Sequence, residues 1–285
     1  MPDHEFLRGL ADDGFETPEI RPHSLEKIRI HNYYVSLFTT SMRLLWPQLA
    51  YLGLYSGPGR ARLAGTGEII ETTALSALRM PHPFTKYILV DNDPQCIAAL
   101  RARVAALPAS RDVEFIEADV NVAADRILGS MPHFDRKSGL LSFCFIDPFS
   151  AELDFEVVRR LGKFRMDFLI LLMLGRDVRT NFTKYLQDAH DTRIAKLIDH
   201  PNWRTEWRER ALQPKDLIRF IYEKFDAAMT RIGYQANPPE EAHPIRIAGK
   251  RVFLYSLVLY SKNPLGKQFW QATRQGTDPQ IRLGI

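Results

Sequence analysis

An apolar run that stops at a Gly-Pro-Gly turn constrains the fold of this chain more than any other feature. The run and the turn together form Tyr51–Arg60, with glycines at Gly57 and Gly59. Glycine lets the backbone turn sharply and lets a ligand approach the main chain, because no Cβ stands in the way. We predict a strand over Tyr51–Tyr55 and a helix over Glu68–Met80. Doubly wound folds hold nucleotide-like ligands where a strand opens through such a loop toward a helix, although a tight turn without a ligand uses the same residues.

Three further apolar runs each stop at an aspartate. They end at Asp91, Asp119 and Asp147, and Asp147 is followed by Pro148 and Phe149. The carboxyl ends of parallel strands lie at one edge of a sheet, and ligands bind there. The sequence therefore predicts that these acids gather near the glycine loop.

Apolar runs and amphipathic stretches alternate through the middle of the chain, which is typical of a parallel sheet covered on both faces. Right-handed crossovers between such strands give a doubly wound sheet. Further strands are predicted at Tyr87–Val90, Val113–Ala118, Leu140–Ile146 and Asp167–Leu174, and further helices at Pro94–Ala106, Asn121–Gly129 and Asp154–Lys163.

A single large domain is predicted over residues 24–285, after a polar arm over residues 1–23 that we expect to order late or to stay mobile. Residues 176–233 depart from the strand–helix alternation and are predicted to form a helical insertion over the ligand edge of the sheet. Tyr234–Ala236 and Val252–Tyr260 are expected to close the sheet as an antiparallel pair.

The order of glycine loop, two acidic strand ends and Asp-Pro-aromatic strand end resembles the motif set of class I S-adenosylmethionine (SAM)-dependent methyltransferases. More narrowly, the chain resembles the three-Cys-motif partner (TcmP) family through Tyr51–Arg60, Asp147–Ser150 and Leu254–Lys262, over about residues 24–274. The resemblance implies an α/β fold with a doubly wound, mostly parallel seven-stranded sheet of the class I methyltransferase (Rossmann-like) type and a helical insertion. It also implies SAM as cofactor and a three-Cys-motif protein encoded nearby as partner.

Six residues are predicted to bind SAM: Gly57, Gly59, Asp91, Asn92, Asp119 and Val120. The glycines would let backbone amides face the methionine part. Asp91 can accept hydrogen bonds from both ribose hydroxyls, although Asn92 and the aspartate after it can instead cap the following helix. Asp119 can accept the adenine amino group with Val120 against the ring, although it can also be a plain loop aspartate.

One residue departs from the family pattern. Many class I enzymes carry an acid where Gly53 stands, and that acid helps to hold the SAM amino group. Glycine cannot do this, so SAM affinity is expected to be reduced, supplied by another side chain such as Glu68, or lost.

Asp147, Pro148 and Phe149 are the predicted catalytic residues, because amino-directed nucleic-acid methyltransferases have an Asp-Pro-Pro-Tyr-like sequence at this place. The acid would orient an exocyclic amino group, and the aromatic ring would stack on a flipped base. This chain has one proline and Phe for Tyr, and Asp-Pro is also a frequent loop starter.

The predicted insertion is rich in arginine, lysine and tryptophan. Arginine can bind phosphate and an indole can stack on a base, so a nucleic-acid surface is one interpretation. The alternative is an amphipathic helix that packs its tryptophans on the core. The residues at helical spacing are Trp203, Arg204, Trp207 and Arg208.

Composition narrows the remaining classes. No apolar run approaches the ~18–20 residues that cross a bilayer, and the start lacks a signal-peptide pattern, so we expect a cytoplasmic protein without membrane contact. Cys96 and Cys144 are the only cysteines and the eight histidines are scattered, so no metal site is predicted. The formal net charge of +4 permits a polyanionic partner.

Two functional hypotheses follow from the sequence: a methyltransferase for a nucleic-acid amino group, or a non-catalytic or differently catalytic adaptor of a three-Cys-motif protein. The oligomeric state stays open.

Overall fold

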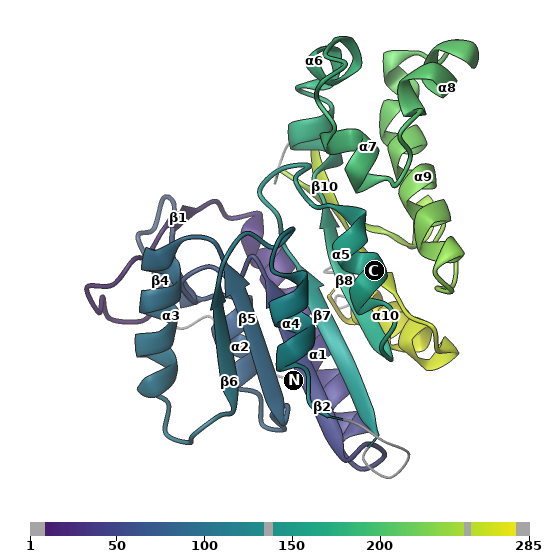
Figure 1. Cartoon of the computed structure of the whole chain (residues 1–285). Coiled ribbons are helices and arrows are strands. Elements are labelled where there is room, and N and C mark those ends of the chain that lie inside the picture. The colour runs from purple at the N-terminus through teal and green to yellow at the C-terminus, as the bar shows by residue number, and fades with distance from the viewer. Residues whose placement is uncertain (1–8, 134–138, 248–251, 278–285) are drawn as a thin grey trace.

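A seven-stranded sheet forms the centre of the protein (Figure 1). The computed structural model describes residues 9–133, 139–247 and 252–277. The first five strands in spatial order are parallel, as the sequence predicts for a doubly wound sheet. The sixth, β10, pairs antiparallel with β8, and β9 pairs antiparallel with β10. Their spatial order is β6 (Val113–Glu117), β5 (Lys86–Asp91), β2 (Gln48–Leu54), β7 (Leu140–Ile146), β8 (Met166–Leu172), β10 (Phe253–Tyr260) and β9 (His243–Arg246).

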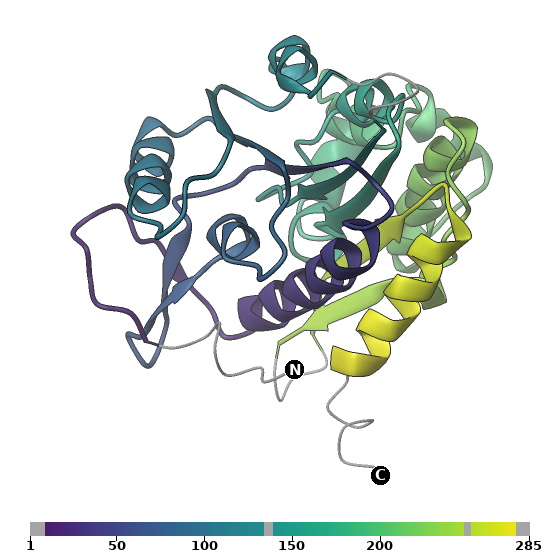
Figure 2. The same cartoon turned by 90° about the horizontal axis from the view of Figure 1, so that it is seen from below.

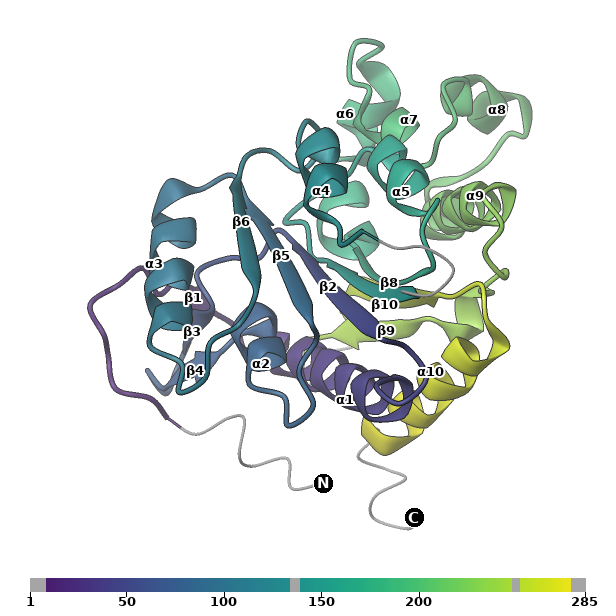
Figure 3. The same ribbon diagram turned by 60° about the horizontal axis from the view of Figure 1, so that its bottom comes forward.

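Helices cover both faces of this sheet (Figures 2 and 3), and each face has its own hydrophobic cluster. The central strands are apolar on both sides, which explains their near-continuous runs of Val, Ile, Leu and Phe. One face carries α1 (Ser24–Met42), α2 (Thr73–Leu78), α3 (Pro94–Ala105) and α10 (Pro264–Thr277). The other carries α4 (Ala124–Ser130), α5 (Phe155–Leu161) and α9 (Leu217–Arg231).

The segment predicted as an insertion is helical. It packs at one end of the sheet (Figure 1), within the hydrophobic cluster on the face that carries α4, α5 and α9. It follows β8 directly and leads into α9. Its elements are the π-helical η1 (Leu174–Val178), then α6 (Phe182–Gln187), α7 (Arg193–Leu197), α8 (Trp203–Glu209) and the 3-10 turn η2 (Pro214–Asp216).

A second, three-stranded sheet corrects the prediction of a helix over residues 68–80. It consists of β1 (Glu19–Ile20), β3 (Arg60–Leu63) and β4 (Ile69–Glu71). Gly65 and Gly67, both with positive φ, turn β3 back into β4, so the apolar residues after them pair as a strand. The helix begins only at Thr73.

The strand predicted at Tyr234–Ala236 is absent among the described residues, and β9 pairs with β10 instead. Side-chain hydrogen bonds take the place of a ladder in this segment. Asn237 donates from Nδ2 to the Leu259 carbonyl, and its amide donates to Asp226. A 3-10 turn, η3 (Pro239–Glu241), then leads into β9.

A buried carboxyl group joins α1 to β8. Asp167 lies 8% exposed and accepts a hydrogen bond from the Tyr34 hydroxyl at 2.8 Å. Burial raises its pKa from 3.8 to about 6, although hydrogen bonds from Ser261 and Tyr34 oppose that rise. Above about pH 6 the carboxyl group is ionised although it is buried, and this lowers the free energy of unfolding.

We expect Asp167 to reduce stability as pH rises. Because its folded-state pKa exceeds the unfolded value, its contribution is most favourable below about pH 4 and is lost between pH 4 and 6, by roughly 3 kcal/mol. Buried His31, whose pKa burial lowers to about 4, has the opposite dependence in nearly the same range.

The free energy of unfolding of wild type and of Asp167→Asn, measured by urea denaturation at pH 4 and pH 7, isolates the contribution of Asp167. The variant should gain stability relative to wild type at pH 7. Exposed Asp112→Asn serves as control, and equal pH profiles for wild type and Asp167→Asn would contradict the expectation.

Candidate functional site

The glycine loop after β2 is tied to the end of β5. The Gly57 amide donates to Asp91 Oδ2 at 2.8 Å, and the Asp93 amide donates to Oδ1 at 3.0 Å. Sequence reasoning predicted that Asp91 lies near the loop, and the structure brings the two together. It also shows that Asp91, only 6% exposed, already fixes the loop, so the Gly57 amide is not free. Each carboxylate oxygen keeps a second lone pair for a further donor.

Two glycines in the loop meet opposite surroundings. Gly59 has φ +86°, and a Cβ there would meet Leu100 Cδ1 at 2.7 Å, so close packing against α3 requires glycine. Gly57 has φ +62° with nothing within 4 Å of a Cβ position. Open space therefore lies over Gly57, where the sequence predicts a ligand.

The structure explains why Gly53 carries no acid. A Cβ at this position would lie 3.0 Å from Ser56 Oγ and 3.2 Å from Leu89 Cδ2. The Ser56 hydroxyl donates to the Gly53 carbonyl and accepts from the Val90 amide, which closes the space. Glu68, the predicted substitute, lies on the hairpin against Gly9 and does not line the cavity described below.

The predicted adenine residues are only partly in place. Asp119 is exposed and accepts the Asn121 amide at 2.7 Å, as loop aspartates do. Val120 is 1% exposed inside the core, so the prediction that it packs on the adenine ring is wrong. Asn92 is exposed beside Asp91, and Asp93 is the residue that caps α3.

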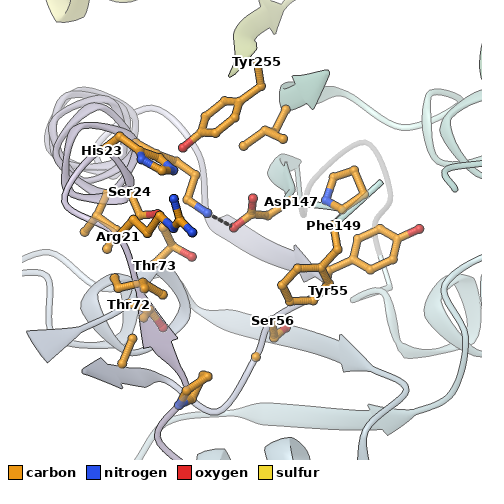
Figure 4. A pocket seen from close by; sticks show the side chains of 18 of the residues that line it. Arg21, His23, Ser24, Tyr55, Ser56, Thr72, Thr73, Asp147, Phe149 and Tyr255 are labelled. Carbon is orange, nitrogen blue, oxygen red and sulfur yellow. Dashed lines mark hydrogen bonds and ion pairs between the residues drawn. The ribbon is translucent and has the colours of Figure 1, made fainter. Parts of the chain in front are cut away.

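Asp147, at the end of β7, forms an ion pair that sequence reasoning missed. Lys27 Nζ on α1 lies 2.5 Å from Asp147 Oδ2, with both side chains 18% exposed (Figure 4). Pro148 is buried, whereas Phe149 is 83% exposed. The three predicted catalytic residues thus lie together, but the carboxylate already holds a primary ammonium group. A lysine 120 residues away in the sequence gives no signal of this contact.

Asp177, in η1, fixes the loop that follows Phe149. Its carboxylate accepts the Ala151 amide at 2.6 Å, the Asn181 side chain at 2.6 Å and the Tyr185 hydroxyl at 3.0 Å. The group is 9% exposed. The loop that carries Asp147 is therefore held from the insertion, a role that the sequence did not indicate.

From residue 9 onward the N-terminal arm packs against the domain, and residues 1–8 lie outside the described residues. Arg103, on α3 and 4% exposed, binds Asp13 through Nε and Nη2 at 2.9 and 2.7 Å. Its Nη1 donates to the carbonyls of Glu16 and Pro58. The hydrogen bond from Arg103 lowers the pKa of Asp13 to about 2. This arginine fastens the arm to the glycine loop.

A cavity of about 350 Å³ lies between the arm, the start of α1, the glycine loop and the end of β7 (Figure 4). Asp147 and Phe149 line it on one side, and Gly57 lines it on another. The five other predicted cofactor residues do not line it: Gly59 in the loop, and Asp91, Asn92, Asp119 and Val120 at the ends of β5 and β6. The cavity thus extends from the glycine loop past Asp147, away from the predicted adenine side.

The tryptophans of the insertion are buried, so the prediction that they stack on bases is wrong. Trp203 is 0% exposed and Trp207 4% exposed, with the Trp207 ring centroid 4.9 Å from that of Phe182. Arg204 donates to the carbonyls of Tyr185, Asp188 and Asp191 and so braces the insertion. Arg208 remains exposed. The packing alternative describes this helix better.

Replacing Trp207 by alanine should destabilise the fold. Loss of a buried indole costs about 3–5 kcal/mol, which chemical denaturation followed by circular dichroism will measure. The neighbouring Arg208→Ala is the control and should change stability by less than about 0.5 kcal/mol. A Trp207→Ala protein as stable as wild type would mean that the indole is not part of the core.

Other site classes find no support in the described residues. They contain no cluster of three or more His, Cys, Asp or Glu side chains placed to hold a metal ion. Among these residues no helix has the length and apolar character that a membrane span needs.

Comparisons with known proteins give weak likenesses. No family model matches the chain, and no curated protein matches it. Among solved structures, protein LPL1258 from Legionella pneumophila has 10% identity over 88% of this chain and 91% of that one, with a TM-score of 0.46. Trm1 from Pyrococcus horikoshii with SAM has 12% identity over 88% of this chain and 58% of that one, with a TM-score of 0.42. The magnesium protoporphyrin IX methyltransferase from Synechocystis with SAM has 8% identity over 82% of this chain and 80% of that one, with a TM-score of 0.41. The fold assignment rests on the strand order of this chain itself.

Proposed function

We propose that this protein is a SAM-dependent methyltransferase that acts on an amino group, most simply one of a nucleic-acid base. The single observation that carries the proposal is the strand order β6-β5-β2-β7-β8-β10-β9 with the glycine loop held by Asp91. This order, with its antiparallel final pair, is the arrangement of class I methyltransferases. It places Gly57, Asp91 and Asp147 at the carboxyl ends of three adjacent strands.

The residues present fit SAM in part. The space over Gly57 admits a ligand against the main chain, and Asp91 has lone pairs left for ribose hydroxyls. Exposed Asn92 and Asp119 border the adenine side. When bound, SAM supplies an activated methyl group on a sulfonium centre. The SAM amino group finds no acid at Gly53, so reduced affinity is expected.

The role of Asp147 follows from its carboxylate and its place. It accepts hydrogen bonds from an ammonium group now, and it can accept them from a neutral amino group of the acceptor once Lys27 withdraws. Phe149 presents an exposed ring at the cavity on which a base can stack. Holding the acceptor nitrogen in line supplies roughly 7–11 kcal/mol toward the barrier, without a strong base.

We expect Asp91→Ala to weaken SAM binding by about tenfold or more, because it removes ribose hydrogen bonds and also releases the Gly57 amide. Isothermal titration calorimetry with SAM and with its demethylated product measures this. Asp112→Ala, at the opposite end of β6, is the control and should bind as wild type does. No heat with wild type at millimolar SAM rules the cofactor out.

We expect Asp147→Ala to abolish methyl transfer while SAM affinity stays nearly unchanged, because only alignment of the acceptor is lost. The assay uses tritiated SAM with pooled DNA and RNA, alone and with a three-Cys-motif protein encoded nearby. Asp112→Ala, an exposed acid that does not line the cavity, is the control. Equal incorporation by wild type and Asp147→Ala would place the target elsewhere.

A second candidate is an adaptor that works with a three-Cys-motif protein, without catalysis or with a different one. The closed space at Gly53 and the engagement of both Asp91 oxygens favour it. SAM binding without incorporation in either arm of the assay selects this candidate.

A further inference from the structure

The cavity beside Asp147 carries an excess of positive charge. Its wall contains four cationic side chains and two carboxylates: Arg21, Lys27, Arg60 and Arg176, against Glu19 and Asp147. Burial lowers the pKa of His23 in the same wall, and the charges of Arg176, Arg21 and Lys27 lower it further. The cations that lower this pKa create a positive potential at the cavity, and this potential favours an anionic guest.

Two buried polar atoms of this wall have no partner in the described part of the chain. They are Arg60 Nε and Thr72 Oγ1. Arg60 Nη1 is bound to Asp13 at 2.8 Å, so the guanidinium is held in place while its Nε–H lacks an acceptor. A guanidinium can only donate, and a buried donor left without an acceptor costs about 1–3 kcal/mol. A small shift of the side chain toward the cavity would let an acceptor atom, such as an anion oxygen, satisfy this donor.

The start of α1 adds to the same field. This 19-residue helix begins at Ser24 beside the cavity, and its N-cap His23 makes no side-chain capping bond. The positive end of the helix dipole lies at the cavity, with Glu26 as the acid in the first turn of the helix. The dipole acts together with the cations of the wall.

We propose that this cavity binds a phosphate group of the methyl acceptor. The proposal rests on the proposed function and names its substrate class. Planar guanidinium groups such as Arg21 and Arg176 match phosphate oxygens, and Arg60 and Thr72 line the same wall. The cofactor residues at the ends of β5 and β6 do not line this space, so we assign the part of the cavity beside Asp147, away from Gly57, to the acceptor.

Phosphate binding also accounts for the ion pair at Asp147. A phosphate in the cavity competes with Asp147 for the Lys27 ammonium, because Lys27 and Asp147 both line the space that the phosphate occupies. When Lys27 turns to the phosphate, the carboxylate becomes available to the acceptor amino group. The acceptor thus opens its own amino site. A cavity of about 350 Å³ accommodates one nucleotide or a phosphorylated small molecule of similar size.

Titration calorimetry at low salt tests the proposal, with orthophosphate, each of the four 5′-mononucleotides and a short single-stranded oligonucleotide as probes. Arg21→Ala and Arg176→Ala should each weaken phosphate binding by about tenfold or more. Arg29→Ala on α1 and Arg179→Ala just after η1 are matched controls, since both side chains are exposed and neither lines the cavity. The same four variants should bind SAM as wild type does.

Each result has a defined reading. Loss of binding in the two cavity variants alone supports the site. Tighter binding of the oligonucleotide than of mononucleotides then assigns the phosphate to a nucleic acid, and the reverse assigns it to a small molecule. Absence of phosphate binding in wild type, or equal loss in the controls, overturns the proposal. Phosphate binding without any SAM binding leaves the phosphate site standing and refutes the methyltransferase assignment instead.

Discussion

The side chain of Arg103 is the contact on which the shape of the candidate site depends. Its guanidinium is 4% exposed and joins three separate parts of the chain: helix α3, the glycine loop at Pro58 and the arm at Asp13. A buried arginine is tolerated only when its donors are satisfied, and here carbonyls and a carboxylate satisfy them. Without this group the arm would lose its anchor on the loop. One wall of the cavity would then be missing.

Carboxylates that accept backbone amides hold the other loops of the site. Asp91 fixes the glycine loop through Gly57, and Asp177 fixes the loop after Phe149 through Ala151. Such charge-assisted hydrogen bonds are stronger than neutral ones and resist local opening. The strand ends therefore present a prepared surface. Three exposed side chains of the cavity can adapt to a guest: Phe149, Arg21 and Arg176.

Patterns within short stretches predicted the sheet and the position of the glycine loop beside Asp91, because periodicity and strand ends are local properties of a sequence. These local patterns did not predict features that depend on contacts between residues far apart in the sequence. The hairpin of β3 and β4 depends on pairing, and the Lys27–Asp147 ion pair depends on the docking of α1. Trp207 has the same helical spacing whether it faces solvent or the core, so only packing against Phe182 determines its burial. The insertion could thus be predicted as helical, but not which of its faces is buried.

The anchoring of the arm has a consequence for the order of events during synthesis. Asp13 and Arg103 lie 90 residues apart, and β1 pairs with β3 through Glu19 and Arg62. The arm is synthesised before α3, so it has no docking surface until α3 has emerged. Contacts of such long sequence separation form late, since closing a long loop must precede them. The arm is thus expected to be among the last segments to settle, and until then the glycine loop stays open to solvent.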